Sequence, residues 1–157
     1  MKVVSIDSKT GEEVVTEIND PRPDFFAFIN DVTLTDSQLR SMIDKMDVSA
    51  DVKAMLYSFS KVTIRAGNVI LQIGRKIVDI LFAILRAFPN ITFGVVFGLI
   101  VGALVASIPV LGAVLGSLAT TIAVAFGFVV GAKADLLSGE MGQRIDAILA
   151  QFSPLSA

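Results

Sequence analysis

Few side chains in this chain of 157 residues have the types and spacing that chemistry needs. Ser58 and Lys61 are three residues apart, so on one helix a lysine amine could activate a serine hydroxyl. Asp44, Asp47 and Asp51 bring three carboxylates together, but the glycine and the final carboxylate of a calcium loop are missing. Such spacings arise in many helical proteins without a site. We therefore interpret these residues as solvated or capping groups and expect no catalytic, cofactor-binding or metal-binding residue.

The composition removes most other routes to catalysis. The chain contains no histidine and no cysteine, which excludes the usual general base, the commonest metal ligand, thiolate chemistry and disulfides. The sequence therefore predicts a non-enzymatic protein without a cofactor.

One long apolar stretch dominates the chain. Hydrophobic residues make up 54% of the sequence, the mean hydropathy is +0.74, and residues 91–132 carry no charge. As helix, this stretch would be about 63 Å long, roughly twice the thickness of a bilayer's hydrocarbon core. The sequence therefore predicts a two-span transmembrane helical hairpin, with spans at 91–107 and 111–132 and Pro109 in the turn.

Residues 49–88 are expected to form a long, basic, amphipathic neck helix that begins at an N-cap, Ser49. The charge balance is −6 over residues 1–51 and +5 over residues 52–90. Three interpretations remain open: the neck lies in a membrane interface, packs against its copies in an oligomer, or belongs to an ordinary protein core. The cations expected to contact anionic lipid headgroups are Lys61, Arg65, Arg75, Lys76 and Arg86 of the neck, with Lys133 after the second span.

The regions at the two ends are polar. Residues 1–48 are expected to form a small head, with a β-hairpin over 2–18 and a short helix over 36–46. Thr35 and Gln38 have the spacing of a capping box, which places the start of that helix. Residues 133–157 are expected to form an amphipathic tail.

Small residues recur at four-residue spacing through both predicted spans. In lipid, such stripes let helices approach closely, which favours a homo-oligomer. The alternative is that each stripe packs only within its own hairpin. The residues concerned are Gly94, Gly98, Gly102, Ala106, Gly112, Gly116, Ala119, Ala123, Gly127 and Gly131.

Together these features predict a mainly α membrane protein, in which a two-span hairpin follows a long amphipathic helix and a small β-hairpin head. Basic segments flank the hairpin, so both termini are expected to be cytoplasmic at a bacterial inner membrane. The general plan resembles small two-span membrane proteins of bacteria, among them holins and defence-associated membrane effectors.

Three functions fit this plan: an oligomeric pore or channel, an anchor whose head recruits a cytoplasmic protein complex, or a hairpin that shapes the membrane. The expected partners are anionic lipids, further copies of the chain and a protein at the head. Nucleic acid is not expected, because the basic neck lacks interleaved aromatic residues.

Overall fold

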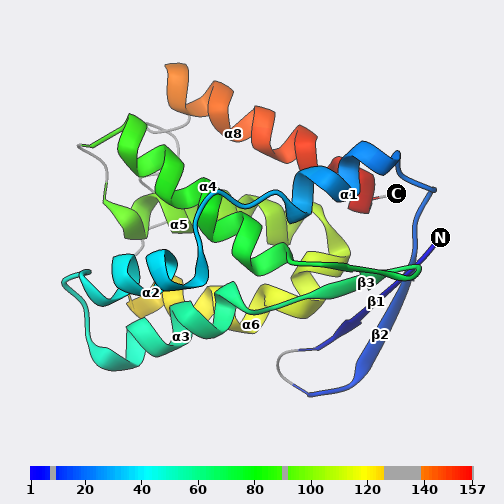
Figure 1. Ribbon diagram of the computed structural model, residues 1–157, viewed down its shortest axis with the longest axis horizontal. Helices are drawn as coiled ribbons and strands as arrows, with labels where there is room; N and C mark the ends of the chain where they lie inside the picture. Colours follow the sequence, from blue (N-terminus) through cyan, green and yellow to red (C-terminus); the bar gives the residue numbers. More distant parts are fainter. Residues whose placement is uncertain (8–9, 90–91, 126–138, 157) are drawn as a thin grey trace.

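The computed structural model describes residues 1–7, 10–89, 92–125 and 139–156, which form helices packed around one core with a small antiparallel sheet toward one end (Figure 1). The first half holds β1 (Lys2–Ile6), β2 (Glu13–Glu17), α1 (Pro23–Asn30), α2 (Asp36–Asp44), α3 (Ala50–Ser60), β3 (Ile64–Ala66) and β4 (Val69–Leu71). The second half holds α4 (Ile73–Ala87), α5 (Phe93–Ser107), α6 (Pro109–Ala125), α8 (Gly139–Phe152) and the 3-10 turn η2 (Ser153–Ser156).

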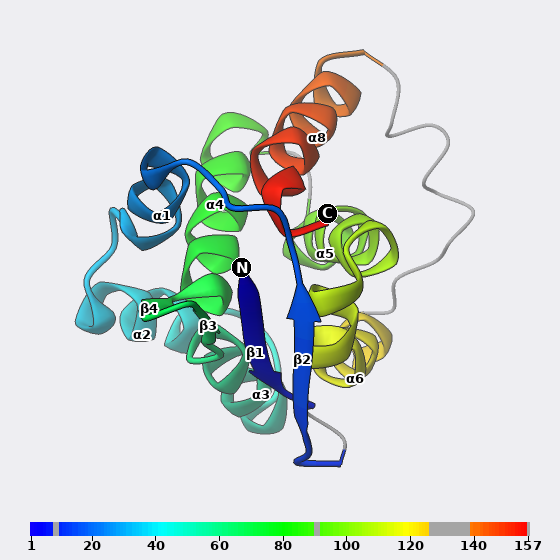
Figure 2. The ribbon, with the colours of Figure 1, turned by 90° about the vertical axis from the view of Figure 1, so that its right-hand side faces the viewer.

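The four strands form one antiparallel sheet in the order β2-β1-β3-β4, seen in Figure 2 in front of the helices. The hairpin predicted near the N-terminus is present, with Val4 opposite Val15. A second hairpin turns at Gly67, which has a φ of +60°, and Asn68. The Gly67 N–H donates to the carbonyl of Lys2 at 3.1 Å, which ties this turn to β1.

The second hairpin replaces the middle of the predicted neck, so the single amphipathic helix over 49–88 is wrong. Ser49 does cap a helix, accepting a hydrogen bond from the Val52 N–H at 3.3 Å, but that helix ends at Ser60. Residues 62–71 place β-branched side chains on both sides of a two-residue turn, which is a hairpin pattern. Pairing of β3 with β1 completes the sheet.

The apolar helices α5 and α6 pack against each other and lie inside the fold. Phe97 of α5 packs edge-on against Phe59 of α3 with ring centroids 5.4 Å apart, and Phe93 lies at the same distance from Phe82 of α4. In Figure 1, α8 lies on one side of α4 and α5, while α3 and α6 lie on the other. The helices around α5 and α6 therefore bury much of their apolar surface.

Among the described residues, no helix is both long enough and apolar enough to cross a membrane. α5 has 15 residues and α6 is described over 17, about 22 and 25 Å of helix against a hydrocarbon core of about 30 Å. The predicted two-span fold, with spans 91–107 and 111–132, is therefore wrong, as is the predicted integral inner-membrane location with both termini cytoplasmic. A helix enclosed by other protein elements is also free of charged residues, and here α3, α4 and α8 pack around α5 and α6. Residues 126–132 of the second predicted span lie outside the described residues.

Candidate functional site

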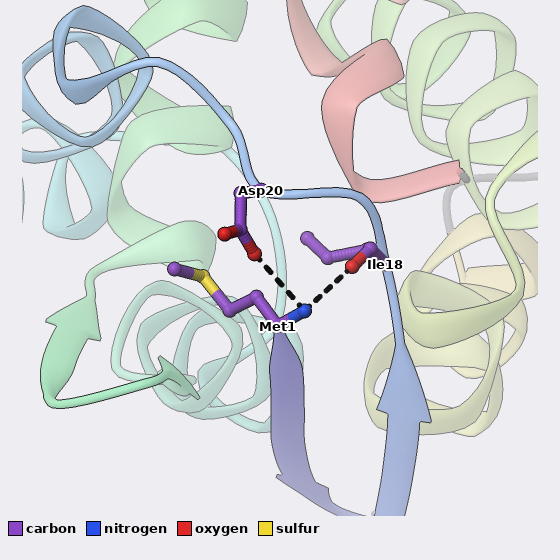
Figure 3. Close-up of polar contacts among 3 residues, drawn as sticks. All are labelled: Met1, Ile18 and Asp20. Carbon is purple, nitrogen blue, oxygen red and sulfur yellow. Dashed lines mark hydrogen bonds and ion pairs between the residues drawn. The ribbon is translucent and has the colours of Figure 1, made fainter.

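The edge strand β2 directs part of its backbone away from the sheet. The amino group of Met1 donates to the Ile18 carbonyl at 2.8 Å and lies 3.1 Å from Asp20 Oδ1 (Figure 3), and the Ile18 N–H donates back to Met1 at 2.9 Å. Met1 and Ile18 are thus a hydrogen-bonded pair, and in an antiparallel ladder such pairs alternate with non-hydrogen-bonded ones. The N–H and C=O groups of Glu13, Val15 and Glu17 therefore point outward from β2.

The register between β1 and β2 supports this assignment at the other end of the hairpin. The Asp7 N–H donates to the Glu12 carbonyl at 2.8 Å, which is the phase that the Met1 pair requires. Within the described residues, no backbone group of another element forms a hydrogen bond with the outward groups of Glu13, Val15 or Glu17. These three residues make β2 an open edge.

The sheet also has an open face beside this edge. Val15, Val4, Arg65 and Ile70 are neighbours in one row across all four strands. Val15 and Ile70 are each 54% exposed and Ile6 of β1 is 61% exposed, although β-branched side chains in sheets usually pack on a neighbour. The opposite face carries buried residues, including Val3 and Ala66. Near β2 the outer face therefore exposes Val15 and Ile6 beside the charged side chains of Glu13, Glu17 and Lys2, without a cover among the described residues.

The other edge of the sheet is closed by a side chain. Asn30, the last residue of α1, donates from Nδ2 to the Ile70 carbonyl at 3.0 Å. Its Oδ1 accepts from the Gln72 N–H, also at 3.0 Å. Ile70 belongs to a non-hydrogen-bonded pair with Arg65, so its carbonyl points outward from β4, and the Gln72 N–H lies directly after the strand. One amide side chain thus occupies two of the positions that a further strand would use.

Charged side chains of α4 fix the segment that directly follows Asn30. Lys76 of α4 is 8% exposed and donates to the Asp31 carbonyl at 2.7 Å, directly after Asn30. Asp79 is 6% exposed and accepts from the Thr33 hydroxyl at 2.6 Å. Arg75 donates to the Leu34 carbonyl at 2.5 Å. Hydrogen bonds to buried charged groups are among the stronger ones in proteins, so the end of α1 is fixed against α4.

The cations predicted to contact lipid headgroups do not share one stripe. Arg75 and Lys76 of α4 instead bond to the carbonyls of Leu34 and Asp31. Lys61 lies with Nζ 4.5 Å from the centre of the Tyr57 ring, Arg65 is exposed on the outer face of the sheet, and Arg86 is exposed in the last turn of α4. Lys133 lies outside the described residues.

Small residues of α5 and α6 line a shallow apolar hollow. Its volume is about 270 Å³, and Thr120, its one hydroxyl, already donates to the Gly116 carbonyl at 2.9 Å. The four small residues around it are Gly98, Gly102, Ala119 and Ala123.

The remaining small residues are placed differently. A Cβ on Gly112 would lie 3.1 Å from the Val105 carbonyl oxygen of α5, and one on Gly116 would lie 3.9 Å from the Val105 side chain. Gly112 and Gly116, two of the small residues predicted to favour a homo-oligomer, thus lie against α5 of the same chain. Gly94 is buried, Ala106 and Pro109 are exposed, and Gly127 and Gly131 lie outside the described residues. The homo-oligomer stays a prediction.

The residues first considered for chemistry are not brought together. Ser58 is exposed on α3, and Lys61 lies against Tyr57. The Asp44 carbonyl accepts from Lys53 Nζ at 2.6 Å, and Asp51 lies in the first turn of α3. In the described part of the chain, no three acidic side chains are grouped so that they could hold a metal ion.

No family model matches the chain, and neither a curated protein nor a solved structure does. The residue that sequence reasoning missed is Asn30, whose role depends on a strand 40 residues later in the chain. Its only local signal is its position at the end of a short helix.

Proposed function

We propose that this protein is a non-enzymatic binding module that captures an extended segment of another protein by β-strand addition at β2. The observation that carries the proposal is the contrast between the two edges of one sheet. Asn30 bonds to the outward Ile70 carbonyl of β4 and to the adjacent Gln72 N–H, whereas the outward groups of Glu13, Val15 and Glu17 have no such partner among the described residues. Strand addition uses these groups for affinity and the adjacent side chains for specificity.

The exposed apolar side chains of Val15 and Ile6 beside the edge support the same function. An added strand would extend the row that contains Val15 and Val4, and it would cover part of this exposed surface. Exposed apolar surface beside unpaired backbone groups is a liability in an isolated protein and an asset in a binding protein. Of the functions considered from the sequence, only recruitment of a protein partner through the head is retained here.

A proline substitution separates binding from folding. Val15→Pro removes an outward N–H but no hydrogen bond to β1, because Val15 and Val4 form a non-hydrogen-bonded pair, and edge strands tolerate such prolines. Val124→Thr is the matched control, since Val124 is 72% exposed on α6 and lies outside the sheet. Urea unfolding of both variants checks that the fold is kept.

The probe is a labelled ten-residue peptide with a Ser-Thr-Val-Thr-Val-Thr-Ser core, titrated with the full chain by fluorescence anisotropy. We expect binding by the parent and by Val124→Thr, and at least tenfold weaker binding by Val15→Pro. We also expect slower amide exchange at Val15 in the complex. Methylation of alternate peptide nitrogens should abolish binding without any change in the protein. Equal binding of the peptide to all three proteins would contradict strand addition. Absence of binding to the parent chain would contradict it as well.

A further inference from the structure

The side chains that flank the open edge restrict which segment it can take. Because Glu13, Val15 and Glu17 alternate along one strand, their side chains project from the same, outer face. Residues of an added strand that pair with these three would project from that face too, with Cβ atoms about 5 Å from their partners. Each of these three positions of the incoming segment therefore faces one known side chain of β2.

Resting on the proposed function, we propose that the segment bound at β2 is basic, with Lys or Arg two residues to either side of a β-branched residue. The basic positions lie opposite Glu13 and Glu17, and the β-branched residue lies opposite Val15. This pattern is the same in both chain directions, so it does not depend on whether the segment binds parallel or antiparallel.

The charge around the edge favours such a partner. Glu13 and Glu17 are exposed, and Glu13 faces Ile6 on β1, so no cation lies opposite it within the sheet. Glu17 faces Lys2, but the described residues form no ion pair between them. Residues 7–20 contain five acidic residues and a single lysine. Opposite charges directly across a ladder stabilise it, and a field of one sign steers a partner of the other sign toward it.

The same charges disfavour a second copy as the occupant. Two β2 strands that overlap fully in an antiparallel pair would place Val15 opposite Val15. Glu13 of each strand would then face Glu17 of the other, at both ends of the pair. Like charges directly opposite destabilise a ladder, so the edge selects against its own sequence.

Three peptides test the charge preference on the full chain. They share the frame Ser-Xaa-Thr-Val-Thr-Xaa-Ser, with Lys, Ser or Glu at both Xaa positions. We expect the Lys peptide to bind on the order of tenfold more tightly than the Ser peptide, and the Glu peptide to bind more weakly still. The advantage of the Lys peptide should shrink as salt rises from about 0.05 to 0.5 M, because exposed charges are screened.

Charge reversal in the protein supplies the second arm. In a Glu13→Lys, Glu17→Lys variant the order of the Lys and Glu peptides should invert. Glu140→Lys is the control, since Glu140 is exposed at the start of α8, outside the sheet, and should leave the order unchanged. Equal binding of all three peptides that is still lost in Val15→Pro would overturn the charge preference and leave strand addition standing. Loss of binding for all three peptides would overturn both. Self-association of the parent chain that the double variant abolishes would identify a second copy as the occupant and also overturn the proposal.

Discussion

Replacing Gly74 by alanine tests how closely α3 and α4 approach each other. Gly74 is the second residue of α4, and its N–H donates to the Val62 carbonyl at 3.0 Å. A Cβ at this position would overlap the carbonyl oxygen of Phe59 and would lie 3.2 Å from the Val62 nitrogen. Neither atom belongs to a side chain that can rotate away. The two helices would therefore have to separate.

The expected effect is a net loss of stability. Overpacking of this kind costs about 1–3 kcal/mol, and loss of the Gly74 hydrogen bond adds about 1 kcal/mol. Alanine is favoured over glycine inside a helix by about 1 kcal/mol, which offsets part of the loss. We therefore expect the free energy of unfolding to fall by about 2 kcal/mol, which corresponds to a decrease in Tm of roughly 4–8 °C for a chain of this size.

The measurement is urea unfolding followed by far-ultraviolet circular dichroism, with the m value as a check that the transition keeps its character. Gly102→Ala is the matched control. Gly102 is exposed on α5, and a Cβ added there would meet no neighbouring atom within 4 Å, so the substitution should stabilise by up to about 1 kcal/mol. The two variants should change stability in opposite directions. If Gly74→Ala is as stable as the parent chain, α3 and α4 do not approach through this glycine and the reasoning is refuted.

Three further substitutions test the sheet and its supports. Ser5 Oγ is buried without a hydrogen-bond partner in the described structure, so Ser5→Ala should raise the free energy of unfolding by about 1 kcal/mol; a loss in urea unfolding would show a partner. Thr33→Val removes the 2.6 Å bond to buried Asp79 and should lower the free energy of unfolding by about 2 kcal/mol in the same assay; an unchanged midpoint would show that this bond contributes nothing to stability. Asn30→Ala frees the Gln72 N–H, whose amide exchange, measured by NMR, should accelerate on the order of tenfold, and an unchanged rate would contradict closure of this edge.

Local signals in the sequence locate several elements correctly. The capping box at Thr35 is present, because its hydroxyl accepts from the Gln38 N–H at 3.1 Å while Gln38 accepts from the Thr35 N–H at 2.9 Å. Ser49 caps α3 as predicted. These features depend on residues a few positions apart, so the sequence contains all the information they need.

Features that depend on distant partners could not be predicted. A run of apolar residues has the same pattern in a membrane span and in a helix enclosed by protein, so the pattern does not reveal the burial of α5 and α6. The basic stripe of the neck misleads in a similar way, because Lys76 bonds to the carbonyl of Asp31, 45 positions away. β3 has only three residues and forms a sheet only by pairing with β1, which is distant in the sequence. The residues on either side of β3 have a helical pattern, so the sequence does not reveal this strand.

The open edge of the candidate site was partly predictable. The pattern of the first eighteen residues predicts a hairpin, and a hairpin alone is marginal in water, so it should pair with a neighbouring subunit, pack on a helix or bind a partner. The sequence could not show which side of the hairpin is used within the fold. That choice follows from β3 pairing with β1, which leaves β2 outermost.

Closure of β4 by Asn30 also limits how many chains can join one sheet. A sheet with two open edges can grow from both sides, and head-to-tail addition of identical units that does not close into a ring produces an open-ended filament. With the β4 side terminated by an amide side chain, a further strand can join this sheet only on the β2 side. Under the proposed function we therefore expect one bound segment per chain, because Asn30 leaves β2 as the edge that can accept one.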